Sequence, residues 1–414
     1  MPKLISRYLV VVELTILFAL VFQCNVLRGV DAEWFRTHQA DSEAIVLSGI
    51  YHKKETGSSD IPLGFYNYGE GDWVTRVFDH FKADSFNGLA YGEYNSQYGL
   101  QGRLFSVIYT TLRTTSRELL ESFNSVISGL IFALLVVWAR DHYGRAEAIV
   151  FAVGVITSTW LIVVSRNLYW VSWTWFLPML VNGLLLLNRP ISPKRWKLVY
   201  VAAAVTLLVK SLCGYEYLTS IVIMAMVPVV ICLLEQGESW FESAKHIALV
   251  GLSSITGFGI ALLMHASARA PNLIEGLSLI KQDALRRTMG LDGDPSALQH
   301  RGKILIRYIF EWDKPAIAYI NLPMWLVLLF AASSAVLLIT RSSLDRRDYA
   351  LAVAYIFSLL GPVSWFVLAK QHSANHTHIN YVLWYMPTFF LGCLCIVRRW
   401  KRGLSELSFA SAKT

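Results

Sequence analysis

The sequence predicts an all-α polytopic membrane protein, in which about ten transmembrane helices form a single domain over residues 1–414. Hydrophobic residues make up 55% of the chain and charged residues only 16%, whereas a soluble domain carries about 25% charged residues. The mean hydropathy is +0.45. Long apolar runs recur along the chain, and each is long enough, or nearly so, to cross a bilayer core of about 30 Å. We therefore expect the bilayer to be the solvent of most of this chain.

The apolar runs define the predicted spans in chain order. The first run is interpreted as a retained span because Phe22 and Gln23 stand where a lipoprotein signal needs small residues, and no cleavage pattern follows. The spans are predicted at residues 8–28, 119–139, 146–165, 169–187, 196–212, 217–234, 246–265, 324–340, 349–368 and 379–397.

The short basic connections predict the orientation of the bundle. Loops rich in Lys and Arg stay on the cytoplasmic side of a membrane, so both termini are expected there. Two long loops, 31–118 and 266–323, are then extracytoplasmic. The net charge of +8 lies mostly in the basic connections, so we expect no nucleic-acid partner. The basic connections are residues 1–7, 140–145, 189–197, 341–348 and 398–402.

Each long loop contains a stretch that predicts an interfacial amphipathic helix. In 102–117 and in 272–290, apolar residues recur at helical spacing beside basic ones. Such helices lie in the headgroup plane. They either bind a lipid-linked phosphate or only anchor the loop at the interface. The basic residues are Arg103, Arg113 and Arg117 in the first stretch and Lys281, Arg286 and Arg287 in the second.

The first candidate site is a pair of acids, Asp41 and Glu43, in the loop after the first span. An Asp held against a hydroxyl accepts its proton as that hydroxyl attacks, so Asp41 is the candidate catalytic base. Glu43 is expected to orient the acceptor or to bind a metal. No metal site is predicted and no cofactor is required, although a divalent cation remains an alternative. The competing interpretation is that these acids are solvated or paired.

The second candidate is a basic cluster between the last two spans, formed by Lys370, His372, His376 and His378. Its side chains supply hydrogen-bond donors for a leaving phosphate. Because a neutral imidazole carries no charge, Lys370 is expected to contribute most to binding the phosphate. Two alternatives are a metal site at His372 and His376 and a polar loop that has no ligand.

Two further groups are predicted to bind substrate. Lys210 lies within an apolar run with Glu216 close by, and a buried ionisable pair is a functional candidate. Gln97 and Tyr98 belong to a stretch, 91–101, rich in Tyr, Gly, Asn and Gln, which suits recognition of hydroxyls or a turn-rich loop. No P-loop, GxSxG, HExxH or dinucleotide fingerprint is present.

The arrangement resembles the GT-C superfamily of integral-membrane glycosyltransferases. These enzymes have many spans, a large first outside loop and a catalytic acid after the first span. Asp41-x-Glu43 matches the acidic motif, and 102–117 is similar to the juxtamembrane helix. The departures are a low span count, the lack of a WWD motif and the distance of Asp41 from the first span, which keeps Asp31 and Glu33 as alternatives.

The resemblance implies a glycosyltransferase that moves a sugar from a polyprenyl-phosphate donor to a glycan or a lipid-linked acceptor, with inversion. It implies action at the extracytoplasmic face of a membrane, which we expect to be a bacterial inner membrane, in the assembly of a cell-envelope polysaccharide. The predicted site residues are Asp41 and Glu43 as the catalytic acids, with Lys370, His372, His376, His378, Arg103, Lys210, Glu216, Gln97 and Tyr98 binding substrate. Alternative functions are a polysaccharide polymerase or ligase, an acyltransferase or a transporter.

Overall fold

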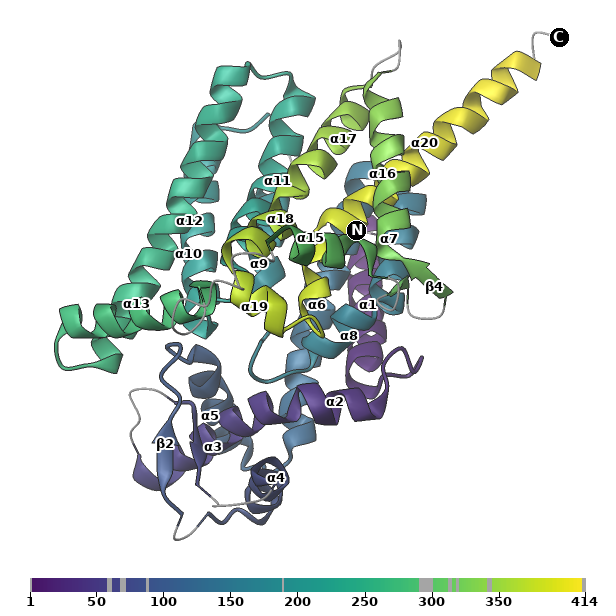
Figure 1. Ribbon diagram of the computed structural model, residues 1–414. Helices are drawn as coiled ribbons and strands as arrows, with labels where there is room; N and C mark the ends of the chain where they lie inside the picture. Colours follow the sequence, from purple (N-terminus) through teal and green to yellow (C-terminus); the bar gives the residue numbers. More distant parts are fainter. Residues whose placement is uncertain are drawn as a thin grey trace.

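The chain folds into a helical bundle with a smaller layer of helices at one end (Figure 1). Helices account for most of the described residues, and the strands among them form two small two-stranded sheets. The computed structural model describes residues 2–57, 62–67, 72–86, 89–187, 190–289, 301–311, 315–317, 320–340 and 345–411.

Among the residues described, six helices are long and apolar enough to cross a membrane. A seventh candidate is the pair α7 (Arg145–Thr157) and α8 (Thr159–Ser165), which meet at 67°. The bend lies at Ser158, whose hydroxyl accepts a hydrogen bond from the Leu161 amide at 3.1 Å and so caps α8. The six are Arg7–Cys24 of α1 (Pro2–Cys24), α6 (Arg117–Tyr143), α10 (Pro193–Cys213), α11 (Leu218–Gln236), α12 (Trp240–Arg269) and Arg346–Leu368, which comprises α17 (Arg346–Ser358) and α18 (Leu360–Leu368).

These helices confirm the all-α membrane class, whereas the count of ten spans stays a prediction. Two other predicted spans correspond to the shorter apolar helices α9 (Trp173–Leu185) and α16 (Met324–Ile339). The last predicted span starts as the 3-10 helix η2 (Asn380–Tyr385) and continues into α20 (Thr388–Ser411).

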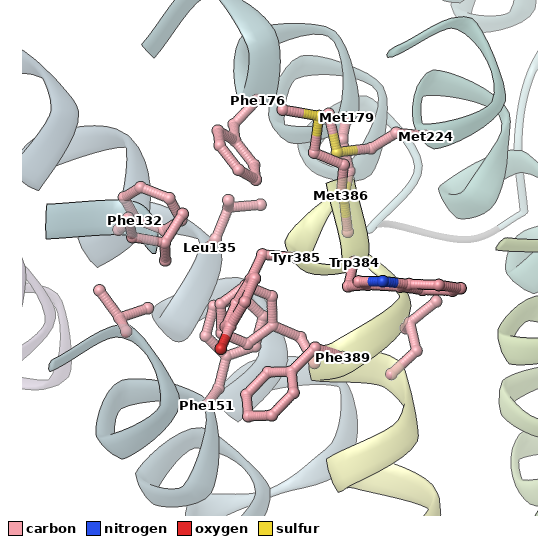
Figure 2. Packing of buried hydrophobic residues seen from close by; sticks show 14 of the residues in the cluster. Phe132, Leu135, Phe151, Phe176, Met179, Met224, Trp384, Tyr385, Met386 and Phe389 are labelled. Carbon is pink, nitrogen blue, oxygen red and sulfur yellow. The ribbon is translucent and has the colours of Figure 1, made fainter. Parts of the chain in front are cut away.

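An aromatic core holds η2 and the start of α20 inside the bundle (Figure 2). Phe132 of α6 packs against Phe176 of α9, with ring centroids 4.7 Å apart. Tyr385 stacks near Phe389 at 4.7 Å, and its hydroxyl donates to the Ala316 carbonyl. This packing holds in place the segment that follows the histidine-rich loop, residues 370–378.

The first long loop is a folded layer, which lies below the bundle in Figure 1. Leu47, Phe81 and Phe105 bury their side chains in its own hydrophobic core. The predicted helix 102–117 is in fact two elements, because Arg113 adopts a left-handed conformation (φ 49°) and ends α5. Arg117 then begins α6. The layer comprises α2 (Ala32–His38), α3 (Ala40–Thr56), β1 (Gly64–Tyr66), α4 (Trp73–Ala83), β2 (Tyr91–Glu93) and α5 (Leu100–Leu112), with β1 and β2 antiparallel.

The second long loop contributes α13 (Leu273–Met289), which corresponds to the predicted amphipathic stretch 272–290 apart from residue 290, outside the described residues. α13 lies across the lower end of α12 (Figure 1). The two helices approach closely at Gly276, where an added Cβ would lie 2.1 Å from the Ala266 carbonyl oxygen. The loop continues into α15 (Arg301–Phe310), β3 (Pro315–Ile317) and β4 (Ile320–Pro323).

Basic residues of the predicted cytoplasmic connections gather at the end of the bundle away from α2–α5. Arg398 and Arg402 donate to buried Asp348 at 2.6 Å and 2.7 Å, and Lys401 donates to buried Glu147 at 2.7 Å. The two ends of the bundle therefore differ in chemistry. Which compartment each end faces stays a prediction.

Candidate functional site

A cavity of about 590 Å³ lies where the α2–α5 layer meets the bundle. Six separate segments of the chain contribute to its wall. They are residues 38–45, Tyr94, the α8–α9 and α10–α11 connections, Arg286 of α13, and α19 (Lys370–Asn375) with the residues that follow it. The three regions that were predicted to carry chemistry thus meet in one place.

Asp41 lines this cavity, and its neighbour Glu43 does not. Both acids lie in the first turn of α3, where successive residues are rotated by about 100°. Residues two positions apart consequently face nearly opposite directions. Asp41 is exposed at the helix surface, whereas Glu43 is 4% exposed. The expectation that the two acids share one site is therefore not met in this cavity.

Glu43 lies at the wall of a second cavity, of about 640 Å³, which Asp41 also borders. Burial raises the pKa of the Glu43 carboxyl well above its ordinary range, and the neighbouring carboxyl of Glu121 raises it further. Burial therefore favours the protonated form of this carboxyl, which is a poorer metal ligand than a carboxylate. Within the described chain no three His, Cys, Asp or Glu side chains are placed to hold a metal ion.

The alternative acids of the first loop have structural partners. Asp31 caps α2, since its carboxylate accepts a hydrogen bond from the Glu33 amide at 2.9 Å. Glu33 forms an exposed ion pair with Arg36 at 2.8 Å. Neither residue lines the first cavity. Of the four acids considered, Asp41 alone borders it.

The histidines of the last loop line the first cavity together with a histidine that the sequence analysis missed. The His372 and His376 rings lie 4.4 Å apart, and the His376 and His378 rings lie 5.5 Å apart. His38, at the end of α2, stacks on His378 with centroids 4.4 Å apart and planes at 20°. The sequence feature that could have identified His38 is its position three residues before Asp41.

The cationic side chain at this cavity is Arg286, whereas Lys370 is not among the lining residues. Lys370 begins α19 and is partly buried. Arg286 is half-exposed and pairs with Asp283 at 3.2 Å. The leading role that was predicted for Lys370 thus has no geometric support at this cavity. The side chain of Arg287 lies outside the described residues.

Glu216 lines the first cavity and extends to a smaller apolar pocket of about 190 Å³, which His372 also borders. Lys210 is buried near it and donates to the Gly214 carbonyl at 2.6 Å. Gly214 has a φ of 149°, and an added Cβ would lie 2.4 Å from both Gln97 Oε1 and Glu216 Oε2. Lys210 and Gln97 therefore support the loop that carries Glu216 without lining the cavity themselves.

Tyr98 and Arg103 form a separate contact in the first loop. The Arg103 guanidinium lies 5.0 Å from the Tyr98 ring centroid. Neither side chain lines the first cavity. Their predicted part in binding substrate is not supported at this position.

Aromatic side chains complete the wall of the first cavity. Asn167 Oδ1 accepts hydrogen bonds from the Tyr169 and Trp170 amides at 2.9 Å and 3.0 Å, which holds this turn in place. Tyr217 donates to Asn380 Oδ1 at 2.7 Å. Rigid aromatic faces beside carboxylates and imidazoles suit a ligand with both apolar faces and hydroxyls.

Comparisons of the chain with protein-family models, curated proteins and solved structures found no match.

Proposed function

We propose that this protein is a glycosyltransferase that uses a polyprenyl-phosphate-linked sugar, with its active site in the first cavity. The observation that carries the proposal is the meeting of two carboxylates, Asp41 and Glu216, with Arg286 and four histidines around a single cavity. Transfer from a phosphate-linked sugar needs a proton acceptor on one side of the reacting carbon and donors for a departing phosphate on the other.

In the proposed step, Asp41 accepts the proton of an acceptor hydroxyl. The hydroxyl oxygen forms a bond to the anomeric carbon as the bond from that carbon to the phosphate oxygen breaks. The leaving phosphate keeps the electron pair and accepts hydrogen bonds from Arg286 and from imidazole N–H groups. Because attack is opposite the leaving group, the anomeric centre inverts.

The predicted acceptor is a glycan or a lipid-linked saccharide, and the predicted location is the extracytoplasmic face of a bacterial inner membrane. The helices that end at the first cavity support this assignment. These helices are long and apolar enough to span a bilayer, and the polar cavity lies at one end of the bundle that they form. At that end, a phosphate held in the membrane can meet a hydroxyl of a soluble or a lipid-linked acceptor.

The test compares two conservative variants in proteoliposomes supplied with a radiolabelled polyprenyl-phosphate hexose or pentose and a saccharide acceptor. Asp41→Asn is expected to abolish transfer while leaving expression and folding intact. Asp31→Asn is the matched control, since Asn caps a helix as well as Asp does. Full activity of Asp41→Asn would show that Asp41 is not the catalytic base. A polymerase or ligase that relies on cationic residues would then be the better assignment.

A further inference from the structure

The second cavity is lined by different residues from the first, apart from Asp41, which borders both. It lies between the start of α3, α4 and the ends of α1 and α6. The glycosyl-transfer step as proposed uses none of its side chains except Asp41. Two of them, Gln39 and Glu43, are nearly fully buried, at 1% and 4% exposure. They are one helical turn apart and therefore face the same side.

Two amide oxygens at this cavity have no hydrogen-bond partner within the described chain. The Gln39 Nε2 group donates to the Val163 carbonyl, which fixes the amide and leaves its Oε1 unpaired. Oδ1 of Asn25 is also unpaired, and its Nδ2 donates to the Val30 carbonyl at 2.6 Å, whereas the Glu43 carboxyl has a hydrogen bond with Glu121. Burying an unpaired acceptor costs about 1–3 kcal/mol. A ligand that donates hydrogen bonds here recovers that cost.

The same cavity offers donors that are held in place by aromatic rings. The Arg166 guanidinium lies 3.6 Å from the Phe35 ring centroid, and its Nε has no hydrogen-bond partner in the residues described. Arg117 lies 4.3 Å from the Phe78 ring centroid. Stacking on a ring fixes the plane of a guanidinium and therefore the direction of its N–H groups.

The charges around this cavity favour a neutral ligand over a phosphate. Two of the three arginines that line it are paired, Arg117 with buried Glu121 at 3.1 Å and Arg36 with Glu33 at 2.8 Å. Asp41 and Asp72 also border the cavity and repel an anion. The wall therefore presents mixed donors and acceptors without an excess of positive charge. Hydroxyl groups both donate and accept, so a polyhydroxylated compound fits this mixture.

We propose that the second cavity is a saccharide-binding site, in which Gln39, Glu43 and Arg166 hold the ligand and Asp41 stands at its edge. Its role as the acceptor site, with a ligand hydroxyl delivered to Asp41, rests on the proposed function. Binding itself does not require transfer, so the two proposals can fail independently.

Cys24 permits a test on the native chain. It lines the second cavity and is exposed, whereas Cys213, Cys232 and Cys395 are buried and Cys393 is partly buried. Alkylation of Cys24 by a small maleimide is followed by mass spectrometry in detergent-solubilised full-length protein. The probes are trisaccharides of glucose, mannose and arabinose, with farnesyl phosphate as the phosphate probe. We expect at least one trisaccharide to slow alkylation and farnesyl phosphate to leave it unchanged.

Variants of residues that line the second cavity test whether the protection of Cys24 arises from saccharide bound there. Gln39→Met and Arg166→Lys each remove a hydrogen bond worth about 1.4 kcal/mol, so the saccharide concentration for half-protection rises about tenfold. His376→Ala, in the first cavity, keeps the native concentration dependence. The proposal is overturned if no trisaccharide protects Cys24, if farnesyl phosphate protects it, or if both variants behave like the native protein. Protection without any transfer activity refutes only the glycosyltransferase assignment.

Discussion

The imidazole of His38 stacks on that of His378, with ring centroids 4.4 Å apart. This contact joins the first long loop, which carries Asp41, to the last loop, which carries the other histidines. It is a direct link between the proposed base and the proposed phosphate-binding side chains. The position of Asp41 relative to the cavity therefore depends on residues from opposite ends of the chain.

We expect His378→Ala to lower transfer about tenfold, because the stack that holds the two loops together is lost. An aromatic pair is worth about 0.5–1.5 kcal/mol. His378→Phe keeps a ring at this position and is expected to recover the part of the rate that depends on the stack, but not any hydrogen bond from the imidazole to the leaving phosphate, as measured by kcat in proteoliposomes. His52→Ala is the control, since His52 stacks on Tyr91 at 3.7 Å and does not line the cavity. Equal losses in His378→Ala and His52→Ala would show a general effect on folding.

Arg286→Gln is expected to raise the KM for the polyprenyl-phosphate donor by roughly tenfold. A hydrogen bond to a charged group contributes about 1.5–3 kcal/mol, and the lower value applies because Arg286 is 53% exposed. The dependence of KM on salt should weaken in the variant, since a charge–charge contact has been removed. Lys281→Gln is the control on the same helix, as Lys281 is exposed and does not line the cavity. An unchanged KM would exclude Arg286 from phosphate binding.

The buried carboxyl of Glu43 predicts a stability that falls as the pH rises. Its pKa is raised in the folded protein because it is buried and lies beside Glu121, so the folded state holds a proton that the unfolded state releases above its ordinary pKa of about 4.3. The contribution to stability is complete below that value and is lost as the pH rises through the folded pKa. Thermal unfolding of Glu43→Gln should therefore show a smaller loss of stability than the native protein as the pH rises above about 4.3.

The matched control for this titration is Glu33→Gln. Glu33 is an exposed acid whose pKa is lowered mainly by its hydrogen bond to Arg36, so its effect on stability lies in the acidic range. The Glu33→Gln variant should keep the native loss of stability as the pH rises. A loss of native size in Glu43→Gln would assign the titration to another group.

Asp348→Asn is expected to lower the free energy of unfolding by about 2 kcal/mol, because it removes the charge of a buried acceptor of charged hydrogen bonds. The loss stays moderate because Arg398 and Arg402 also pair with Asp345. Arg398 and Arg402 both donate to this carboxylate, at 2.6 Å and 2.7 Å. Asp141→Asn removes a more exposed pair with Arg7 and should cost less than about 1 kcal/mol. Chemical or thermal unfolding in detergent measures both values. Similar losses in the two variants would contradict the expected effect of burial.

Composition alone determined that the chain is an all-α membrane protein, because so apolar a sequence cannot hide its surface from water. Local residue chemistry also singled out Asp41, Glu216, Arg286 and the last-loop histidines as candidates for a site. These predictions depend on side-chain type and on hydropathy over a short window, which a sequence displays directly. The span count is less readily predicted, since α9 and α16 are short and residues 379–397 begin with η2 rather than a regular helix.

Only the tertiary structure decided which candidates meet. Asp41 and Glu43 are near neighbours in sequence, but helical rotation places Glu43 at the wall of the second cavity, where burial raises the pKa of its carboxyl. Lys370 lies beside the histidine cluster in sequence and is replaced at the cavity by Arg286, from another helix. His38 became a site residue through its stack on His378. Such relationships depend on long-range packing, and residue spacing carries no information about the direction in which a distant side chain points.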